Sequence, residues 1–123
     1  MKQIIKEHLV DCSDREVFCF SLTCPECGTV WKSSPTRFSK AREEPQSESK
    51  RIIFETLYQR EQMQALTRAL DEAVYHFNFC PFCKRIICNN CFLICDDLDM
   101  CRSCAERFQE DGEKVSCVGQ MNG

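Results

Sequence analysis

The sequence predicts a small α+β metal-bound domain, with zinc-knuckle β-hairpins and one long helix inserted between the first and second C-x2-C pairs. Three observations lead to this fold class. The chain has only 123 residues, which is too short for a large hydrophobic core. Cysteine accounts for 12 of these residues, so cysteine chemistry must explain the fold. Eight of the cysteines form four C-x2-C pairs, namely Cys24/Cys27, Cys80/Cys83, Cys88/Cys91 and Cys101/Cys104.

The N-terminal quarter is predicted to form an arm and a hairpin. Residues 1–16 are mostly polar and are expected to be an N-terminal arm or a short helix. In 17–32, apolar residues alternate on both sides of the sequence CPECG, which indicates two strands and a tight turn. Gly28 suits a positive-φ position in that turn. We therefore expect a β-hairpin over 17–32.

A linker and one long helix are expected next. Residues 33–50 are rich in serine, proline and charge, as linkers are, and Ser47 and Ser49 are candidate helix N-caps. Residues from about 51 to 78 contain neither Gly nor Pro, and an apolar stripe recurs there at helical spacing, at Met63, Leu66, Leu70, Ala73 and Phe77. We expect the stripe to cover the metal-bound part of the domain. The alternative is a partner-binding or dimer surface.

The other three cysteine pairs lie in a zinc-finger block over 79–108. The hairpin, linker, helix and block together make a single double-zinc domain over 17–108. Residues 109–123 are polar, contain three glycines and are expected to be a flexible tail.

The redox state of the cellular compartment determines whether the thiols bind metal or form disulfides. The N-terminus lacks the apolar stretch and small-residue cleavage site of a secretory signal, and no run is apolar enough for a membrane helix. We therefore expect a cytoplasmic protein with no membrane partner. Cytoplasmic thiols are kept reduced, so a cysteine-rich chain there is more often metal-binding than cross-linked by disulfides.

The C-x2-C spacing has a chemical reason. Two intervening residues allow a tight knuckle to place both thiolates on one ion, and two knuckles complete the tetrahedral four-sulfur site of structural zinc. Eight such cysteines predict two zinc ions. Pairing Cys80/Cys83 with Cys88/Cys91 is disfavoured because only four residues separate these knuckles. The spacing leaves open whether the pairs combine sequentially or in an interleaved order.

The second block resembles FYVE-type zinc fingers, which are related in geometry to RING fingers with treble-clef knuckles and cross-braced ions. The likeness lies in the run C-x2-C-x4-C-x2-C over Cys80–Cys91, in the apolar Ile86-Ile87 before Cys88, and in the final C-x2-C pair. It is also similar to small prokaryotic zinc-ribbon proteins, in which a CPxCG hairpin precedes a helix and a CPxC block. The resemblance implies interleaved sites: Cys24, Cys27, Cys88 and Cys91 in site 1, and Cys80, Cys83, Cys101 and Cys104 in site 2.

The FYVE lipid function is not implied. FYVE domains bind a phosphoinositide head group through a basic stretch, whereas the matching segment here is Val74–Cys80, where His76 is the one ionisable residue before the cysteine. Phosphate recognition needs Arg or Lys, so no phosphoinositide partner is expected. His76 itself is expected beside the metal site or in solvent, and not as a ligand.

Four thiolates around each ion leave no open position for catalysis, and the chain has no nucleophile motif or nucleotide-binding loop. We therefore expect a non-enzymatic binding or adaptor module for an unidentified protein partner. One alternative is a nucleic-acid-binding zinc ribbon, because a local basic run interleaves with aromatic residues at Trp31, Lys32, Arg37, Phe38, Lys40 and Arg42. The net charge of −3 argues against it. A second alternative is a rubredoxin-like iron electron carrier, because four thiolates also bind iron.

Four cysteines lie outside the pairs: Cys12, Cys19, Cys95 and Cys117. Cys19 and Cys95 follow apolar neighbours and are expected as small buried residues. Cys117 falls in the expected tail, where Cys12 would meet it if the termini came together.

Overall fold

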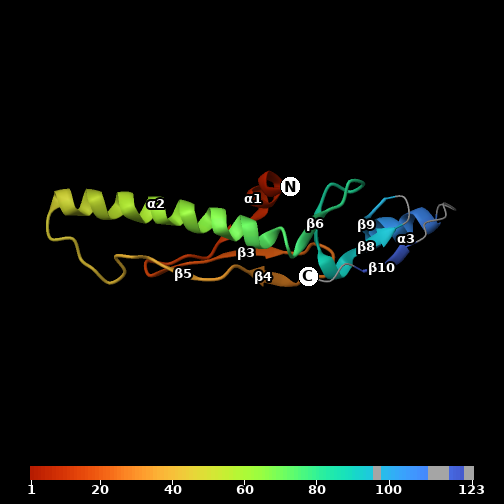
Figure 1. The fold of residues 1–123 in the computed structure, drawn as a ribbon, viewed down its shortest axis with the longest axis horizontal. Coiled ribbons are helices and arrows are strands. Elements are labelled where there is room, and N and C mark those ends of the chain that lie inside the picture. The colour runs from red at the N-terminus through yellow and green to blue at the C-terminus, as the bar shows by residue number, and fades with distance from the viewer. Residues whose placement is uncertain (96–97, 111–116, 121–123) are drawn as a thin grey trace.

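The computed structural model describes residues 1–95, 98–110 and 117–120 and shows a small, elongated α+β protein (Figure 1). The long helix α2 runs along strands β2 to β5 at one end, and β6 to β10 with α3 form the other end. The helices are α1 Lys2–His8, α2 Glu48–Ala73, α3 Arg102–Glu110 and the short 3-10 helix η1 Asn89–Cys91. The strands are β1 Val10–Asp11, β2 Val17–Phe18, β3 Phe20–Thr23, β4 Val30–Lys32, β5 Thr36–Arg37, β6 Phe77–Phe79, β7 Ile86–Cys88, β8 Phe92–Cys95, β9 Met100–Cys101 and β10 Cys117–Gln120.

All strand pairs are antiparallel and form small sheets in the orders β1-β3-β4, β2-β5, β6-β7 and β10-β8-β9. Strands β3 and β4 form a hairpin around the first C-x2-C pair, with Leu22 opposite Trp31. Strand β2 pairs instead with β5, which lies in the segment interpreted from sequence as a linker. That segment is thus partly strand, and its Phe38 is 1% exposed.

Helix α2 begins earlier and ends earlier than the range of 51–78 expected from sequence. Its N-cap is Ser47, whose hydroxyl accepts a hydrogen bond from the backbone N–H of Lys50 at 3.2 Å. The helix ends at Ala73 because the chain turns over the next three residues and enters β6. Phe77, the last residue of the expected helical stripe, lies in that strand opposite Cys88.

The buried face of α2 differs from the stripe expected from sequence. Its fully buried residues are Ala65, Ala69 and Ala73, spaced four apart, with Leu66 and Leu70 partly buried beside them. Met63, which opened the expected stripe, is 57% exposed. The small alanines allow the helix to lie close to the strands, and the larger apolar side chains flank that contact.

Two separate clusters make up the hydrophobic core. The helix–sheet cluster, between α2 and the strands, consists of Phe18, Phe20, Phe38, Ala65 and Ala69. The cysteine cluster, at the other end, contains five cysteines among its fourteen buried residues: Cys24, Cys80, Cys91, Cys101 and Cys104. The first cluster contains no cysteine, whereas the second combines five cysteines with large apolar side chains such as Phe77 and Ile87.

Residues 1–16, expected to be an arm or a short helix, contain the short helix α1 and the strand β1. Ile5 is fully buried in the cysteine cluster, and Lys2 pairs with Asp71 of α2 at 2.5 Å. Much of the expected tail over 109–123 lies outside the described residues, but its described strand β10 pairs with β8. Among the described helices, none has the combination of length and apolar content that crossing a bilayer requires.

Candidate metal centres

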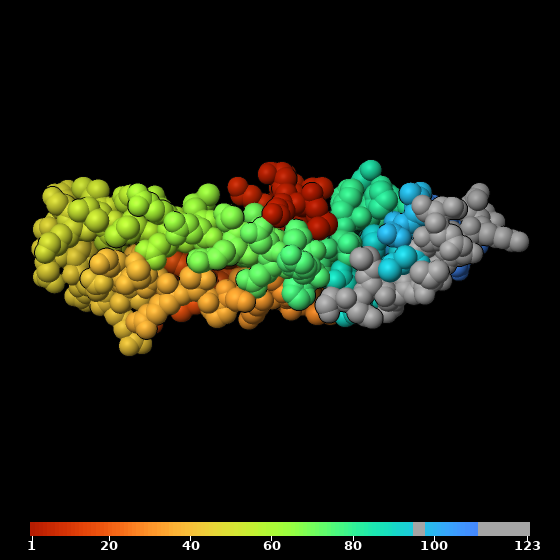
Figure 2. Space-filling model, in the orientation of Figure 1, coloured from red at the N-terminus to blue at the C-terminus, as the bar shows by residue number. Residues whose placement is uncertain are grey.

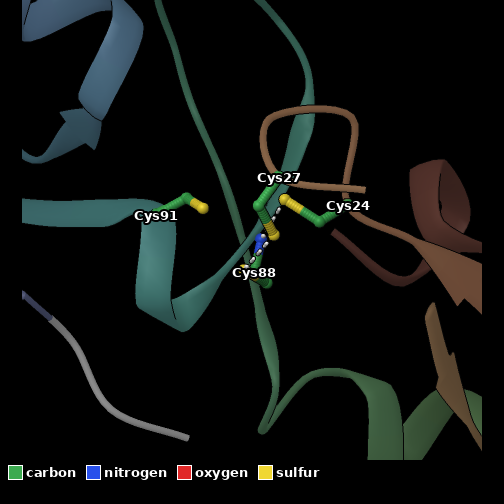
Figure 3. A group of neighbouring side chains, drawn as sticks. All are labelled: Cys24, Cys27, Cys88 and Cys91. Carbon is green, nitrogen blue, oxygen red and sulfur yellow. Dashed lines mark hydrogen bonds between the residues drawn. The ribbon is translucent and has the colours of Figure 1, made fainter. Parts of the chain in front are cut away.

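The structure brings eight cysteines together in two groups. The first group is Cys24, Cys27, Cys88 and Cys91, and the second is Cys80, Cys83, Cys101 and Cys104. Figure 3 shows the first group, in which the β3–β4 turn supplies one pair and the β7–η1 segment supplies the other. This is the interleaved grouping that the zinc-finger resemblance implies, and it ties segments more than 60 residues apart to each other.

The sulfur separations fit a four-coordinate metal ion. Cys27 and Cys88 Sγ lie 3.7 Å apart, as do Cys83 and Cys101 Sγ, and Cys80 and Cys104 Sγ lie 3.8 Å apart. Within each group all four sulfur atoms are within 4.8 Å of one another. A tetrahedral site with zinc–sulfur bonds of about 2.3 Å needs sulfur atoms about 3.8 Å apart. A disulfide would need about 2.05 Å, and all ten cysteines whose side chains are described are free.

The turns that hold Cys24/Cys27 and Cys80/Cys83, called here the first and second knuckles, have the same backbone hydrogen bonds. In the first, Gly28 N–H donates to Cys24 O at 2.8 Å and Cys24 N–H donates to Thr29 O at 2.9 Å. In the second, Lys84 N–H donates to Cys80 O at 2.9 Å and Cys80 N–H donates to Arg85 O at 3.0 Å. The residue after the second cysteine has a positive φ in both, 77° for Gly28 and 61° for Lys84. The sequence predicted the Gly28 conformation, but nothing in it marked Lys84.

The second half of each group is also built alike. Its first cysteine ends a strand, β7 or β9, and its second cysteine lies in the helix that follows, η1 or α3. Cys88 N–H donates to Cys24 Sγ and Cys101 N–H donates to Cys80 Sγ, each at 3.4 Å. These N–H groups direct partial positive charge at the two sulfur atoms. The protein therefore contains two copies of one four-cysteine arrangement.

Electrostatics favour charge on one thiol in each of two pairs, Cys24/Cys27 and Cys80/Cys83. Hydrogen bonds from the hydroxyl and backbone N–H of Thr29 lower the pKa of Cys27 to about 6. Burial opposes charge on Cys83, but hydrogen bonds from the Arg85 side chain and backbone outweigh it and lower the pKa of Cys83 to about 7. Burial raises the pKa of Cys91 and Cys104, and the neighbouring sulfur atoms raise it further. Buried sulfurs this close need a cation before all four can be charged.

Arg85 and Glu26 connect the two groups. Arg85 Nε lies 3.3 Å from Cys83 Sγ, and its guanidinium also reaches Cys101 Sγ at 3.8 Å. The same guanidinium pairs with Glu26 Oε2 at 2.8 Å, and Glu26 lies inside the first knuckle, between Cys24 and Cys27. Ser103, between the last two cysteines, donates its hydroxyl to the other oxygen of Glu26. Half-buried Glu26 thus joins the first knuckle to both halves of the second group.

Two asparagines hold the first group against the end of α2. Asn89 follows Cys88 and is buried; its side-chain amide donates to Tyr75 O at 2.8 Å, and its backbone N–H donates to His76 O at 3.0 Å. Asn78 donates to the side-chain oxygen of Asn89. Asn89 lies between Cys88 and Cys91, where the ligand spacing could have marked it from sequence, whereas no sequence signal marked Asn78.

The residues expected outside the metal sites lie as follows. His76 belongs to neither cysteine group, and its exposed ring lies 5.5 Å from the ring of Trp31. Cys12 is exposed with its Sγ 3.3 Å from Ser21 Oγ, and Cys19 is half-buried with its Sγ 3.5 Å from Ser33 O. The side chains of Cys95 and Cys117 lie outside the described part of the structure.

The basic run considered for nucleic-acid binding does not form one surface patch with its aromatic residues. Phe38 lies in the helix–sheet cluster, so its ring is not available for stacking. Arg42 pairs with Glu16 at 3.1 Å, and Lys40 lies 3.9 Å from Glu43. Trp31 is half-buried and packs edge-on against Phe77 at 6.2 Å.

The two cysteine groups are therefore defined by their own geometry. Each combines four thiols at metal-binding distance with N–H donors directed at sulfur and, in the second group, a guanidinium. Comparisons with protein-family models, with curated proteins and with solved structures find no match to the chain.

Proposed function

We propose that this protein is a non-enzymatic adaptor module that binds two structural zinc ions and presents a surface to a protein partner. The observation that carries the proposal is the pair of four-sulfur groups at tetrahedral spacing. An all-cysteine donor set of this size is typical of structural zinc, which is closed to substrate. Zinc would supply the positive charge that lets the buried thiols ionise together.

The proposal includes a finer fold assignment, a cross-braced double zinc finger of the FYVE and RING type. Its support is the interleaved order of the groups and the repeated knuckle, strand and helix in each. Cross-bracing makes each ion hold two distant segments, so neither half of the cysteine-rich end is expected to fold by itself.

The absence of catalysis is also part of the proposal. If each ion holds four thiolates, no coordination position is left for water or substrate, which catalytic zinc requires. Folding then depends directly on metal, by on the order of 10 kcal/mol per structural site.

The test is elemental analysis of protein purified under reducing conditions, together with its absorbance spectrum. Two zinc ions per chain in a colourless solution support the proposal. Iron with visible absorbance that bleaches on reduction would replace it with an electron carrier. Protein without bound metal, or with disulfides among the eight cysteines, would contradict it.

A further inference from the structure

We propose that the outer face of α2 docks an acidic amphipathic helix of the partner protein, which makes this helix the adaptor surface of the proposed function. The outer face is defined by Ile52, Ile53, Thr56, Arg60, Met63, Thr67 and Arg68. Figures 1 and 2 show α2 along one edge of the molecule, with α1 beside only its C-terminal half. The proposal rests on the adaptor function above and adds the place and chemistry of contact.

The apolar residues of this face are exposed and in register. Ile52, Ile53 and Met63 are 62%, 59% and 57% exposed. Ile52 and Met63 are eleven residues apart, which is about three helical turns, so they lie on the same side of α2. Between and beyond them, the hydroxyls of Thr56 and Thr67 donate to the carbonyls of Ile52 and Met63 at 2.8 and 3.1 Å. These hydroxyls are satisfied by their own helix, so they need little from a partner.

The acidic residues of α2 are engaged with the rest of the molecule. Beyond the first turn, Glu55 pairs with Arg15 at 3.0 Å and Asp71 pairs with Lys2 at 2.5 Å. Glu72 accepts two hydrogen bonds from Ser34, at 2.9 and 3.0 Å. Glu61 likewise accepts from the backbone and hydroxyl of Ser39. The remaining acid of the helix, Glu48, lies in its first turn, where the helix dipole favours negative charge.

The basic side chains of α2, in contrast, have no such contacts among the described residues. Within the described ranges, no hydrogen bond or ion pair involves the side chains of Lys50, Arg51, Arg60 or Arg68. Arg60 and Arg68 are two helical turns apart, and both lie on the exposed side of α2. The acidic side chains of α2 therefore contact other parts of the protein, whereas its basic side chains are available to solvent or to a partner.

Exposed apolar side chains together with unpaired arginines on the outer face favour one kind of partner. Exposed Ile and Met need apolar side chains opposite them, and unpaired Arg favours carboxylates at the rim, as an acidic amphipathic helix supplies. A second copy of α2 would bring arginines near arginines, which opposes self-association. A single-stranded nucleic acid would need aromatic rings for stacking, and the outer face has none.

A cavity beside the outer face can receive an anchoring side chain. It has a volume of about 350 Å³ and includes the apolar residues Ile53, Phe54 and Leu57, with Lys40 and Lys50 at its rim. Glu43 and Glu44 also line it, and Glu43 lies 3.9 Å from Lys40. Interfaces gain most of their binding energy from side chains buried in such pockets.

The test measures binding by fluorescence anisotropy, with protein whose metal content is determined in the same sample. The probe is a labelled peptide of about 20 residues in which Leu and Ala form one helical face and Glu the other. Two controls are the same peptide with Lys in place of Glu, and an oligothymidine of similar length. We expect saturable binding of the acidic peptide that weakens as salt is raised, and neither control should compete.

The variants locate the site. Arg60→Glu combined with Arg68→Glu should weaken binding of the acidic peptide by about tenfold or more, since each tenfold step needs only ~1.4 kcal/mol. Ile52→Ser combined with Met63→Ser should weaken it similarly, and neither pair should change metal content. Arg37→Glu is the matched control, because Arg37 is an exposed base on β5, away from the outer face; binding should stay within about twofold.

The possible failures are distinguishable. If metal-loaded protein does not bind the acidic peptide, or binds the basic one equally well, the docking proposal is wrong and the metal proposal stands. Tighter binding of oligothymidine, lost on reversing Arg60 and Arg68, would assign the face to nucleic acid instead. Unchanged peptide affinity in both double variants would also overturn the proposal. Protein without metal would contradict the proposed function itself.

Discussion

The two ends of this molecule have hydrophobic cores of different chemistry. At the helix–sheet end, Phe38 packs against three rings at 5.1 to 5.9 Å, those of Phe18, Phe54 and Tyr58. Polar contacts add to this packing, as when Tyr58 donates to Asp14 O at 2.9 Å and Gln62 donates to Asp11 at 2.6 Å. At the cysteine end, short strands of two to four residues surround sulfur atoms.

This difference predicts which end of the molecule needs bound metal for its stability. Aromatic burial stabilises the helix–sheet end whether or not an ion is bound. In the cysteine cluster, five buried thiols lie among larger apolar side chains, and they can all be charged only around a cation, so we expect the stability of that end to depend on metal. We therefore expect one chain with a metal-independent end and a metal-dependent end.

The largest effect is expected from Cys101→Ser. Cys101 is fully buried in the second cysteine group, and loss of its thiolate should release that ion, which costs on the order of 10 kcal/mol. Native mass spectrometry should show one metal per chain instead of two, and circular dichroism should show less helix. Cys19→Ser, a change at a half-buried thiol outside both groups, is the control and should keep two ions. A Cys101→Ser protein with two ions and full helicity would refute the assignment.

Phe38→Ala should produce the converse effect. Removing a ring that is 1% exposed leaves a cavity in the helix–sheet cluster and should lower the free energy of unfolding by about 3–5 kcal/mol. Chemical denaturation measures this loss, and elemental analysis should still give two metals per chain. Loss of metal in this variant would mean that the two ends are not independent.

Arg85→Gln should shift the pH at which the second group releases metal. Hydrogen bonds from Arg85 help to lower the pKa of Cys83 to about 7, so protons compete less for this sulfur. The stabilisation from a lowered thiol pKa is fully present above the ordinary thiol value and is lost as pH falls through about 7. Without Arg85, release from the second group should occur at higher pH than in the unmodified protein.

A colorimetric chelator added over a pH series measures this release. Among the described residues no guanidinium contacts the sulfur atoms of the first group, so its release pH should shift less, although Arg85 also pairs with Glu26 in its knuckle. Arg42→Gln, which removes a surface arginine that pairs with Glu16, is the control and should leave both groups unchanged. An unchanged profile for Arg85→Gln would show that the guanidinium does not affect metal binding.

The smallest effect is expected from Cys12→Ser. Cys12 is exposed, and its sulfur contacts the Ser21 hydroxyl at 3.3 Å. Serine can make that contact, so the free energy of unfolding should change by no more than about 0.5 kcal/mol. Thermal melting and metal analysis check this. A lost ion would mean that a ninth thiol takes part in metal binding.

More of the cysteine end than of the helix–sheet end could be predicted from the sequence. C-x2-C spacing is a local pattern, so it identified the eight cysteines that the structure brings together. Their grouping depends on contacts between residues more than 60 apart. Spacing could not choose between sequential and interleaved order, and only the resemblance to known zinc fingers pointed to the second.

The helix–sheet end was harder to predict because its informative residues have weak patterns. Ala73 was part of the expected stripe, but Ala65 and Ala69 were missed because alanine contributes little to a hydrophobic stripe, and the larger Met63 was included although it is 57% exposed. Phe38 stands in a segment with linker-like composition, yet it is buried, and so is Ile5 of the cysteine cluster, which stands in a polar arm. Their burial depends on tertiary contacts, which override local composition.

The most direct test of the two-end account measures amide hydrogen exchange along the chain, before and after metal is removed with a chelator under reducing conditions. If only the cysteine-rich end depends on metal, protection persists over α2, β2 and β5 and disappears over β6–β9 and α3. Protection that survives at both ends without metal, or that disappears equally from both, would contradict it.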